Sequence, residues 1–209
     1  MALLDKILAL TSHFRRKRMR RFVHTFSITD QTEILDVGGE PAFWGDFTPN
    51  ARITVLNTCV PPLSPRCLLV VADGCRLPFR QECFDIAFSN SVIEHLGSFQ
   101  NQQRFAGEIR NVAKAIWVQA PARSFPIEPH LWGLCIHWLP KSLQVKLARR
   151  LTIWGWLATD YDRDIAVFLK EVRLLTFREM KELFPDCEIK RERWLMMTKS
   201  YIAIRRGSG

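Results

Sequence analysis

The chain has 209 residues, of which 47% are hydrophobic and 24% charged, and its formal net charge is +9. This composition is typical of a globular protein with a buried core, and it excludes a disordered or collagen-like chain. No apolar run is long enough to span a membrane, and the first charged cluster follows the N-terminal apolar stretch, so we expect neither a membrane span nor a signal peptide. The positive charge favours anionic partners.

The N-terminal residues 1–26 are expected to be helical and to precede a single domain at 27–209. An apolar stretch is followed by a basic run at 15–21. We favour a helix that packs on the domain and leaves its basic face in solvent, because most charge runs are solvated. The alternative is that residues 11–26 bind an anionic membrane surface or nucleic acid. The apolar side of this helix would consist of Phe14, Met19, Phe22, Val23 and Phe26.

Five short apolar runs follow, at 34–37, 52–57, 68–72, 84–90 and 115–120. Each ends in a polar residue, Gly or Pro, and helical or loop segments separate them, which is the pattern of a parallel sheet covered on both faces. The carboxyl ends of parallel strands meet at one edge of the sheet, where ligands bind. Five residues are therefore expected to be neighbours: Asp36, Gly38, Asn57, Asp73 and Asn90.

The first run ends in Asp36-Val37-Gly38-Gly39. Two glycines allow the backbone to bend and to approach a ligand closely, so the stretch indicates a nucleotide-type site. This stretch alone does not identify such a site, since Gly-Gly is a common turn and the full Gly-x-Gly-x-x-Gly fingerprint is absent.

Residues 121–175 interrupt the alternation and are expected to form a helical insertion that covers the site. Apolar spacing predicts one helix near 143–154 and another near 165–172. The chain then resumes with Thr176-Phe177-Arg178-Glu179, a capping-box pattern at a helix start. Two strands, near 188–195 and 199–205, are expected to close the domain.

The six cysteines contain no Cys-x-x-Cys pair of the kind that zinc sites use. We expect reduced thiols packed as small hydrophobes, and hence a reducing compartment such as the cytoplasm, with peripheral membrane attachment as an option. The cysteines are Cys59, Cys67, Cys75, Cys83, Cys135 and Cys187.

Four segments, which follow one another in the order and spacing of a known family, carry a resemblance to it: 34–39, 71–79, 84–95 and 176–206. The chain resembles the class I S-adenosylmethionine-dependent methyltransferases, in particular small bacterial methyltransferase-domain proteins related to the ubiquinone and menaquinone biosynthesis enzymes. The resemblance implies an α/β, doubly wound, mostly parallel seven-stranded sheet whose last strand is antiparallel, with a helical insertion after the fifth strand. It also implies S-adenosyl-L-methionine as the cofactor.

The resemblance also implies roles for single residues. Those at the methionine and ribose part of the cofactor are Asp36, Gly38 and Gly39, those at the adenine are Asp73 and Gly74, and those near the transferred methyl are Asn90 and Ser91. Two positions depart from the family pattern. The third glycine of the first motif is missing. Asn57 stands where the family has an acid that binds the ribose hydroxyls, and its amide can hydrogen-bond a hydroxyl but cannot form the charge-assisted bond.

Methyl transfer from a sulfonium is an in-line displacement, so the protein mainly orients and desolvates the reactants. A base is needed only if the acceptor keeps its proton at neutral pH. The candidates are Glu94, His95 and His130, each of which could instead be structural. No metal is expected, because the spacing of Glu128, His130 and His137 is not that of a recognised ligand set.

We therefore predict an enzyme that methylates a small or lipid-like acceptor. One alternative is an RNA or protein methyltransferase that uses the basic surface. Nucleic acid is the less favoured partner, because the fourth motif lacks the Asn/Asp-Pro-Pro-aromatic form linked to methylation of base amino groups. A second alternative is a non-catalytic binding module that retains the fold, supported by Asn57 and the altered first turn. The acceptor, the atom methylated and the oligomeric state cannot be read from the sequence.

Overall fold

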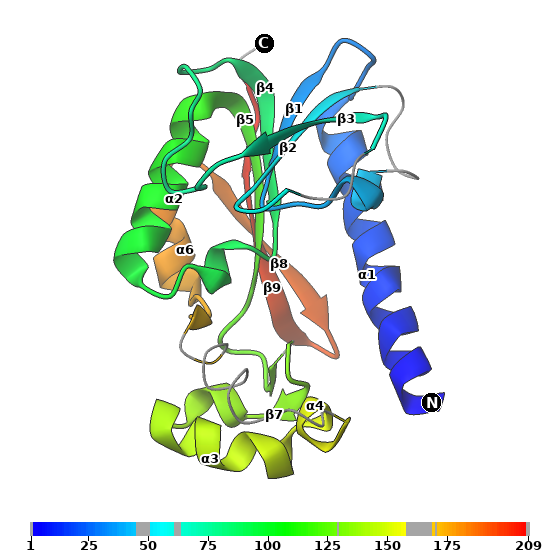
Figure 1. The fold of residues 1–209 in the computed structure, drawn as a ribbon, viewed down its shortest axis with the longest axis vertical. Helices are drawn as coiled ribbons and strands as arrows, with labels where there is room; N and C mark the ends of the chain where they lie inside the picture. Colours follow the sequence, from blue (N-terminus) through cyan, green and yellow to red (C-terminus); the bar gives the residue numbers. More distant parts are fainter. Residues whose placement is uncertain are drawn as a thin grey trace.

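The computed structural model describes residues 2–44, 51–60, 64–128, 130–157, 169 and 171–207, and of residues 2–11 and 154 the backbone alone. A central sheet runs through the molecule, with α2 and α6 on one side, α1 on the other and a small cap at one end (Figure 1). None of the helices in the described part of the chain combines the length and the apolar character that crossing a bilayer requires.

The sheet has seven strands in the order β3-β2-β1-β4-β5-β9-β8. The first five strands in the chain pair in parallel, and β9 pairs antiparallel with both β5 and β8. This arrangement confirms the predicted fold class, including the antiparallel last strand. The strands are β1 Glu33–Val37, β2 Arg52–Asn57, β3 Cys67–Val71, β4 Phe84–Asn90, β5 Ala113–Pro121, β8 Glu188–Trp194 and β9 Met197–Arg205.

Two helices with defined N-caps cover one face of the sheet. The helix α2 (Phe99–Val112) begins after Ser98, whose side chain accepts a hydrogen bond from the Asn101 backbone N–H. The helix α6 (Phe177–Leu183) begins with the complete capping box that its sequence predicts. Their apolar sides pack on β1, β4 and β5, and the largest side chains enclosed there include Phe105, Ile109 and Phe184. Capping and amphipathic spacing thus fix both helices locally.

The helix α1 (Ala2–Phe26) covers the opposite face. Phe22 contacts Phe88 and Trp117 with ring centroids 4.9 and 5.6 Å apart, and Met19 is fully buried beside it. Trp44 joins this aromatic cluster from η1 (Pro41–Trp44), the 3₁₀ turn that is the described part of the β1–β2 connection. The segment forms one continuous helix, and its apolar side lies where the spacing predicts. Arg18 departs from the expectation because it is buried.

The cap follows β5 and combines β6 (Ile127–Glu128), β7 (Gly133–Leu134), η3 (Ile136–Trp138), α3 (Lys141–Leu151) and α4 (Ile153–Leu157). It has its own small core, made by Leu131, Ile136, Ala148 and Leu169. The predicted apolar face of α3 points the other way: Leu143 and Leu151 are exposed, whereas Gln144 and Ala148 are buried. The helix predicted near 165–172 lies largely outside the described residues.

All six cysteines are free thiols, as expected for reduced residues. Cys59 and Cys83 are exposed, so the expectation that every thiol packs in the interior is wrong for these two.

Candidate functional site

The carboxyl ends of β1, β2 and β3 lie side by side, as the parallel order requires. The Gly38 N–H donates to the Leu56 carbonyl at 2.7 Å, and the Ala72 N–H donates to the Asn57 carbonyl at 3.0 Å. The Asn57 side chain donates to the Gly39 carbonyl at 3.1 Å and accepts from the Thr58 N–H at 2.8 Å. Asn57 therefore anchors the glycine turn, so its amide already has partners within the chain.

Asp36 is enclosed at the end of β1, with 1% of its surface exposed. Its Oδ2 accepts a hydrogen bond of 2.7 Å from Trp44 Nε1, and its Oδ1 has no hydrogen-bond partner among the described residues. Burial raises the pKa of this carboxyl to about 7, even though the Trp44 bond opposes the rise. Asp36 is thus a buried acid with one unpartnered oxygen at the strand edge where ligands bind.

The glycines of this edge are needed for close packing within the chain. A Cβ at Gly39 would lie 1.7 Å from Asp36 Oδ2, and Gly38 has a φ of +80° that disfavours other residues. A Cβ at Gly38 would lie 2.6 Å from a methyl carbon of Val92, and one at Gly74 would lie 2.9 Å from the Phe105 ring. The space beside each glycine is therefore filled by the chain's own side chains.

Asp73 follows β3 and is exposed. Its Oδ1 accepts a hydrogen bond of 2.8 Å from the Cys75 N–H, and its own carbonyl accepts from the Arg76 N–H at 2.9 Å. This turn holds the carboxylate beside the end of β2, since Val71 pairs with Asn57 across the two strands. Asp73 is the accessible acid of the edge.

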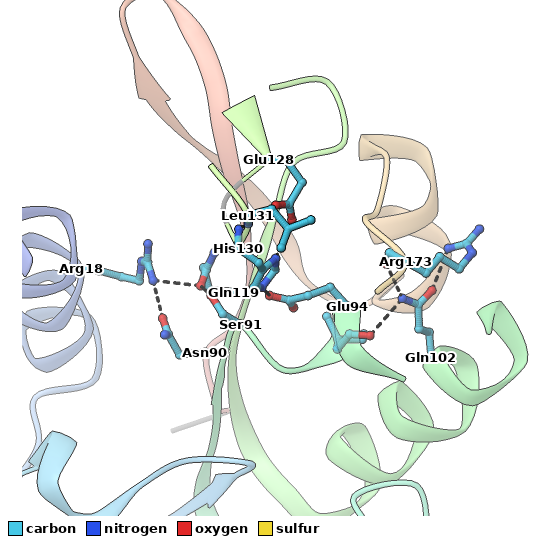
Figure 2. A network of polar contacts seen from close by, with 11 residues as sticks. Arg18, Asn90, Ser91, Glu94, Gln102, Gln119, Glu128, His130, Leu131 and Arg173 are labelled. Carbon is cyan, nitrogen blue, oxygen red and sulfur yellow. Dashed lines mark hydrogen bonds and ion pairs between the residues drawn. The ribbon is translucent and has the colours of Figure 1, made fainter. Parts of the chain in front are cut away.

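Asn90 ends β4, Ser91 follows it, and both join a polar network around Arg18 (Figure 2). Ser91 Oγ donates to Gln119 Oε1 at 2.8 Å, and Arg18 donates to the same oxygen at 2.9 Å. Arg18 also donates to Asn90 Oδ1 and forms an ion pair with Glu192 at 2.9 Å. Sequence reasoning missed Arg18, Gln119 and Glu192, which come from α1, β5 and β8.

A cavity of about 240 Å³ opens beside this network. Aromatic side chains form much of its wall. Polar groups come from three cationic side chains and, in addition, from Asn90, Ser91 and His130. The Lys199 ammonium lies 4.0 Å from the Phe14 ring centroid, and burial lowers the pKa of Lys199 to about 8. The aromatic residues are Phe14, Phe125, Trp132 and Trp194, and the cationic ones are Arg15, Arg18 and Lys199.

The three candidate base residues lie together between β4 and the cap. The 3₁₀ turn η2 (Ile93–His95) follows β4 and places Glu94 inside the protein with 0% of its surface exposed. His130 of the cap approaches it, with His130 Nε2 3.7 Å from Glu94 Oε1, and the rings of His95 and His130 are edge to face at 4.7 Å. The structure thus brings together Glu94, His95 and His130, as Figure 2 shows for Glu94 and His130.

Glu128 fixes the position of His130. Its Oε1 is 2.8 Å from His130 Nδ1, and its Oε2 accepts hydrogen bonds from the backbone N–H groups of His130 and Leu131. His137 lies apart from this group, because its Nε2 donates to the Arg123 carbonyl at 3.0 Å. The orientation of His130 is therefore set by a buried carboxylate.

The surroundings shift the pKa values of this group in opposite directions. Burial raises the pKa of Glu94 to about 7, and burial together with His130 lowers the pKa of His95 to about 4. Burial alone would lower the pKa of His130, but the bond to Glu128 and the charges of Glu128 and Glu94 outweigh it, so its pKa is raised. The cluster therefore holds an acid whose pKa is raised to about 7 and two histidines whose pKa values are shifted in opposite directions.

Comparisons with known proteins agree with the sheet order. Residues 46–115 match the sequence profile of a family described as "Methyltransferase domain". A search of curated proteins finds no match.

Solved structures show the same fold at low identity. A Burkholderia thailandensis 1,6-didemethyltoxoflavin-N1-methyltransferase, solved with its namesake compound and S-adenosylhomocysteine, is 15% identical, with a TM-score of 0.56 over 98% of this chain and 83% of that one. A Rhodobacter sphaeroides protein described as a zinc-dependent alcohol dehydrogenase is 9% identical, with a TM-score of 0.61 over 92% of this chain and 89% of that one. An Aquifex aeolicus S-adenosylmethionine-dependent methyltransferase is 11% identical, with a TM-score of 0.51 over 96% of each chain.

At such identities the solved structures establish the fold, and the family match supplies the sequence signature over one third of the chain. The strand order and the antiparallel β9 are those of the Rossmann-like methyltransferase fold, and the segment at 46–115 is similar in sequence to a methyltransferase domain.

Proposed function

We propose that the protein transfers a methyl group from S-adenosylmethionine to a small or lipid-like acceptor bound in the cavity at the end of β4. The observation that carries this proposal is the position of that cavity. Asn90 and Ser91 belong both to its wall and to the strand edge that holds Asp36 and Asp73. An acceptor there would lie next to a cofactor bound along the edge, which is the juxtaposition that in-line transfer requires.

The residues of the edge fit a cofactor that carries ammonium and sulfonium groups. The unpartnered Asp36 Oδ1 and the exposed Asp73 carboxylate are acceptors that suit a cationic ligand with amino and hydroxyl donors. Asp36, Gly38, Gly39 and Asn57 would hold the methionine and ribose part, with Asp73 and Gly74 at the adenine. When bound, the cofactor supplies an electrophilic methyl carbon.

The chain's own side chains orient the acceptor and exclude water. Arg18 holds Asn90 and Gln119 in place, so that their remaining polar atoms and the Ser91 hydroxyl present a fixed polar wall. The aromatic residues of the opposite wall remove water from the acceptor. Fixed dipoles in a dry cavity cost little reorganisation during the reaction, which favours the displacement.

Among the three candidate bases, His130 is the one that lines the cavity. Its Nδ1 is bonded to Glu128, and the raised pKa suits a group that accepts a proton from an acceptor hydroxyl. Glu94 is fully enclosed, and His95 is kept neutral by its lowered pKa. We assign the contact with the acceptor to His130 and supporting positions to Glu94 and His95.

The walls of the cavity favour an amphiphilic, anionic acceptor. Arg15 and Lys199 are cationic, whereas Arg18 is already paired with Glu192. Lys199 lies 4.0 Å from Glu192 and over the Phe14 ring, and Arg15 is exposed. Aromatic rings beside these two cations suit an apolar body that ends in a carboxylate or phosphate. This combination supports a lipid-like acceptor over a neutral sugar or an amine.

The basic face of α1 supports a second proposal, that residues 11–26 hold the protein at an anionic membrane surface. Arg15, Arg16, Lys17, Arg20 and Arg21 are exposed on one helix, and Arg15 also lines the cavity. A surface of anionic lipid would therefore face the entrance to the acceptor site. Sedimentation with vesicles that contain phosphatidylserine should deplete the protein from solution at low salt, and phosphatidylcholine vesicles should not.

The decisive test is calorimetry with S-adenosylmethionine and S-adenosylhomocysteine, followed by transfer of labelled methyl groups to an anionic lipid extract. We expect one bound cofactor per chain and at least tenfold weaker binding for Asp36→Asn, because the amide, unlike the carboxyl, cannot lose a proton to pair with the ammonium group. Asp30→Asn, at an exposed acid of the β1 approach, is the matched control and should bind as the wild type does.

The outcomes separate the alternatives. Absence of heat and of a thermal shift with either cofactor would support a non-catalytic module. Label found in RNA, together with RNA affinity that falls steeply with salt, would move the acceptor from lipids to nucleic acid.

A further inference from the structure

The group formed by Glu94, His95 and His130 has the composition and spacing of a metal site. Each residue offers one ligand atom, and all three atoms lie within 4.8 Å of one another. Two residues come from the turn after β4 and the third from the cap, so the fold, rather than a local sequence motif, assembles the set. The set differs from the Glu128, His130 and His137 combination that the sequence spacing excludes.

Glu94 is the strongest indication that something is bound there. Its side chain is 0% exposed, and neither carboxylate oxygen has a hydrogen-bond partner among the described residues. The cationic atom that approaches it, His130 Nε2, is 3.7 Å from Oε1, which is too far for a hydrogen bond. A buried carboxylate without donors is costly, and a divalent cation between Glu94 and the two histidines would remove that cost.

The turn that carries Glu94 is held firmly in place. Gln102 Nε2 donates to the carbonyls of Ile93 and Arg173 at 3.0 and 2.9 Å, and the Arg173 N–H donates to the Glu94 carbonyl at 2.7 Å. Arg173 in turn donates to Gln102 Oε1 at 2.7 Å. This support, visible on the right of Figure 2, fixes the backbone while leaving the carboxylate without a partner.

His130 has the orientation of a metal ligand. Its Nδ1 is bonded to Glu128 Oε1 at 2.8 Å, so its Nε2 is the atom that faces Glu94. A carboxylate on the far nitrogen of a ligating histidine fixes the tautomer and raises its basicity, and Glu128 is itself fixed by two backbone N–H groups. In Figure 2, His130 lies between Glu128 of the cap and Glu94 of the turn.

We propose that Glu94, His95 and His130 bind a divalent transition metal ion, with Glu128 as the positioning residue behind His130. Bonds of about 2.1 Å to a tetrahedral ion place ligand atoms about 3.4 Å apart. The 3.7 Å separation therefore needs little change, and a separation at the 4.8 Å limit would have to shorten by roughly 1.4 Å. Two imidazoles and one carboxylate favour Zn²⁺, Co²⁺ or Mn²⁺ over Mg²⁺.

Three protein ligands leave coordination positions open, and His130 lines the acceptor cavity. On the basis of the proposed function, the ion would bind the acceptor oxygen and lower the pKa of its hydroxyl, in place of proton abstraction by His130. Metal binding itself is measurable without the cofactor, so the two proposals can fail separately.

The test begins with full-length protein that has been treated with a chelator and dialysed. Calorimetry with Zn²⁺, Mn²⁺ and Mg²⁺ should give one site per chain for the two transition metals and much weaker binding of Mg²⁺. Co²⁺ should produce a visible absorption band typical of low-coordinate nitrogen and oxygen ligands. No stoichiometric binding, or a preference for Mg²⁺, would overturn the proposal.

Variants assign the ligands. Glu94→Gln keeps the shape and removes the buried charge, so it should remain folded and lose at least 100-fold in Zn²⁺ affinity. Glu128→Gln should lose about 10- to 100-fold, as expected when the partner of a ligating histidine is changed. His24→Asn, at an exposed histidine of α1, is the matched control and should not change affinity.

Thermal melting of each variant guards against loss of fold. Wild-type affinity in a folded Glu94→Gln protein would refute the site. Titration of the metal-free protein with S-adenosylhomocysteine distinguishes the two proposals. Cofactor binding without any metal site would refute only the metal proposal, and metal binding without cofactor binding would refute only the proposed function.

Discussion

The two halves of the candidate site are built in different ways. At the ends of β1–β3, the polar groups come from neighbouring turns, and the chain packs against its own glycines, as with Gly39 and Asp36. At the end of β4, the polar groups come from α1, β5, β8 and the cap, and they enclose a cavity. The first half depends on backbone conformation and the second on side chains that meet over long sequence distances. Substitutions should therefore affect them differently.

The largest effect should follow Gly39→Ala. The new Cβ would lie 1.7 Å from the carboxylate of Asp36, which is buried and bonded to Trp44, so neither group can move without breaking the edge. We expect a loss of about 4 kcal/mol of unfolding free energy or more, measured by denaturant titration, together with loss of cofactor binding.

Gly107→Ala is the matched control for this substitution. Gly107 lies in α2, and a Cβ there would meet nothing within 4 Å. Alanine should stabilise the helix by roughly 0.5–1 kcal/mol. Equal stability of the two variants would show that the β1 turn can relax, and the contrast between the two halves of the site would fail.

The sequence predicted the first half better than the second, for a physical reason. Strands such as β1 and β2 are apolar runs that lead into polar residues or glycine, which is a purely local signal. Arg18, by contrast, belongs to a run of basic residues that appeared solvated. Its burial depends on Asn90, Gln119 and Glu192, none of which is near it in the chain.

The same limit applies to the cap and to the Glu94 group. The sequence offered His130 as a candidate, but it did not show that a turn after β4 and a short β6–β7 pair bring His130 next to Glu94. The apolar spacing of α3 predicted its existence correctly and its orientation wrongly, since Gln144 faces inward to donate to the Leu139 carbonyl at 2.7 Å. Tertiary hydrogen bonds decided both cases.

Arg18→Met should have the next largest effect and should act on the second half alone. It removes a buried charge that contacts Asn90, Gln119 and Glu192, and it leaves Glu192 enclosed without its main partner. We expect about 3 kcal/mol of destabilisation in urea titrations, because breaking a buried ion pair strands the other charge.

Cofactor affinity, measured by calorimetry at a temperature where the Arg18→Met variant is folded, should change much less than stability does. The stability of Arg16→Met, at an exposed arginine two residues away, should lie within about 0.5 kcal/mol of that of the wild type. A variant that loses cofactor affinity as strongly as stability would show that the two halves are coupled.

The pH dependence of stability tests the first half of the site through the buried carboxyl of Asp36. Its pKa is about 7 in the folded protein and near 3.8 when unfolded, so between these values the folded state keeps a proton that the unfolded chain has lost. Stability from this group is therefore complete below pH 4, falls as the pH rises to about 7 and is constant above it. The fall should amount to roughly 4 kcal/mol.

Asp36→Asn should flatten that part of the curve, measured as unfolding free energy between pH 4.5 and 7.5. Asp30→Asn serves as the control, because Asp30 is exposed and should leave the slope unchanged. A wild-type curve that rises over this interval would mean that Asp36 is ionised and satisfied in the folded protein.

The smallest effect concerns the acceptor cavity and Lys199. Burial lowers the pKa of this ammonium to about 8, so its charge, and with it the attraction for an anionic amphiphile, should weaken as the pH rises through 8. Binding of 11-(dansylamino)undecanoic acid, followed by fluorescence, should be several-fold weaker for Lys199→Gln at pH 7, about 1 kcal/mol. Lys146→Gln, at an exposed lysine of α3 outside the cavity, should bind as the wild type does.

The wild-type affinity should fall toward that of Lys199→Gln between pH 7 and 9, whereas the affinity of Lys199→Gln should stay constant. If both proteins showed the same pH profile, the charge that selects the acceptor would lie on another residue, and Arg15, which also lines the cavity, would be the one to change next.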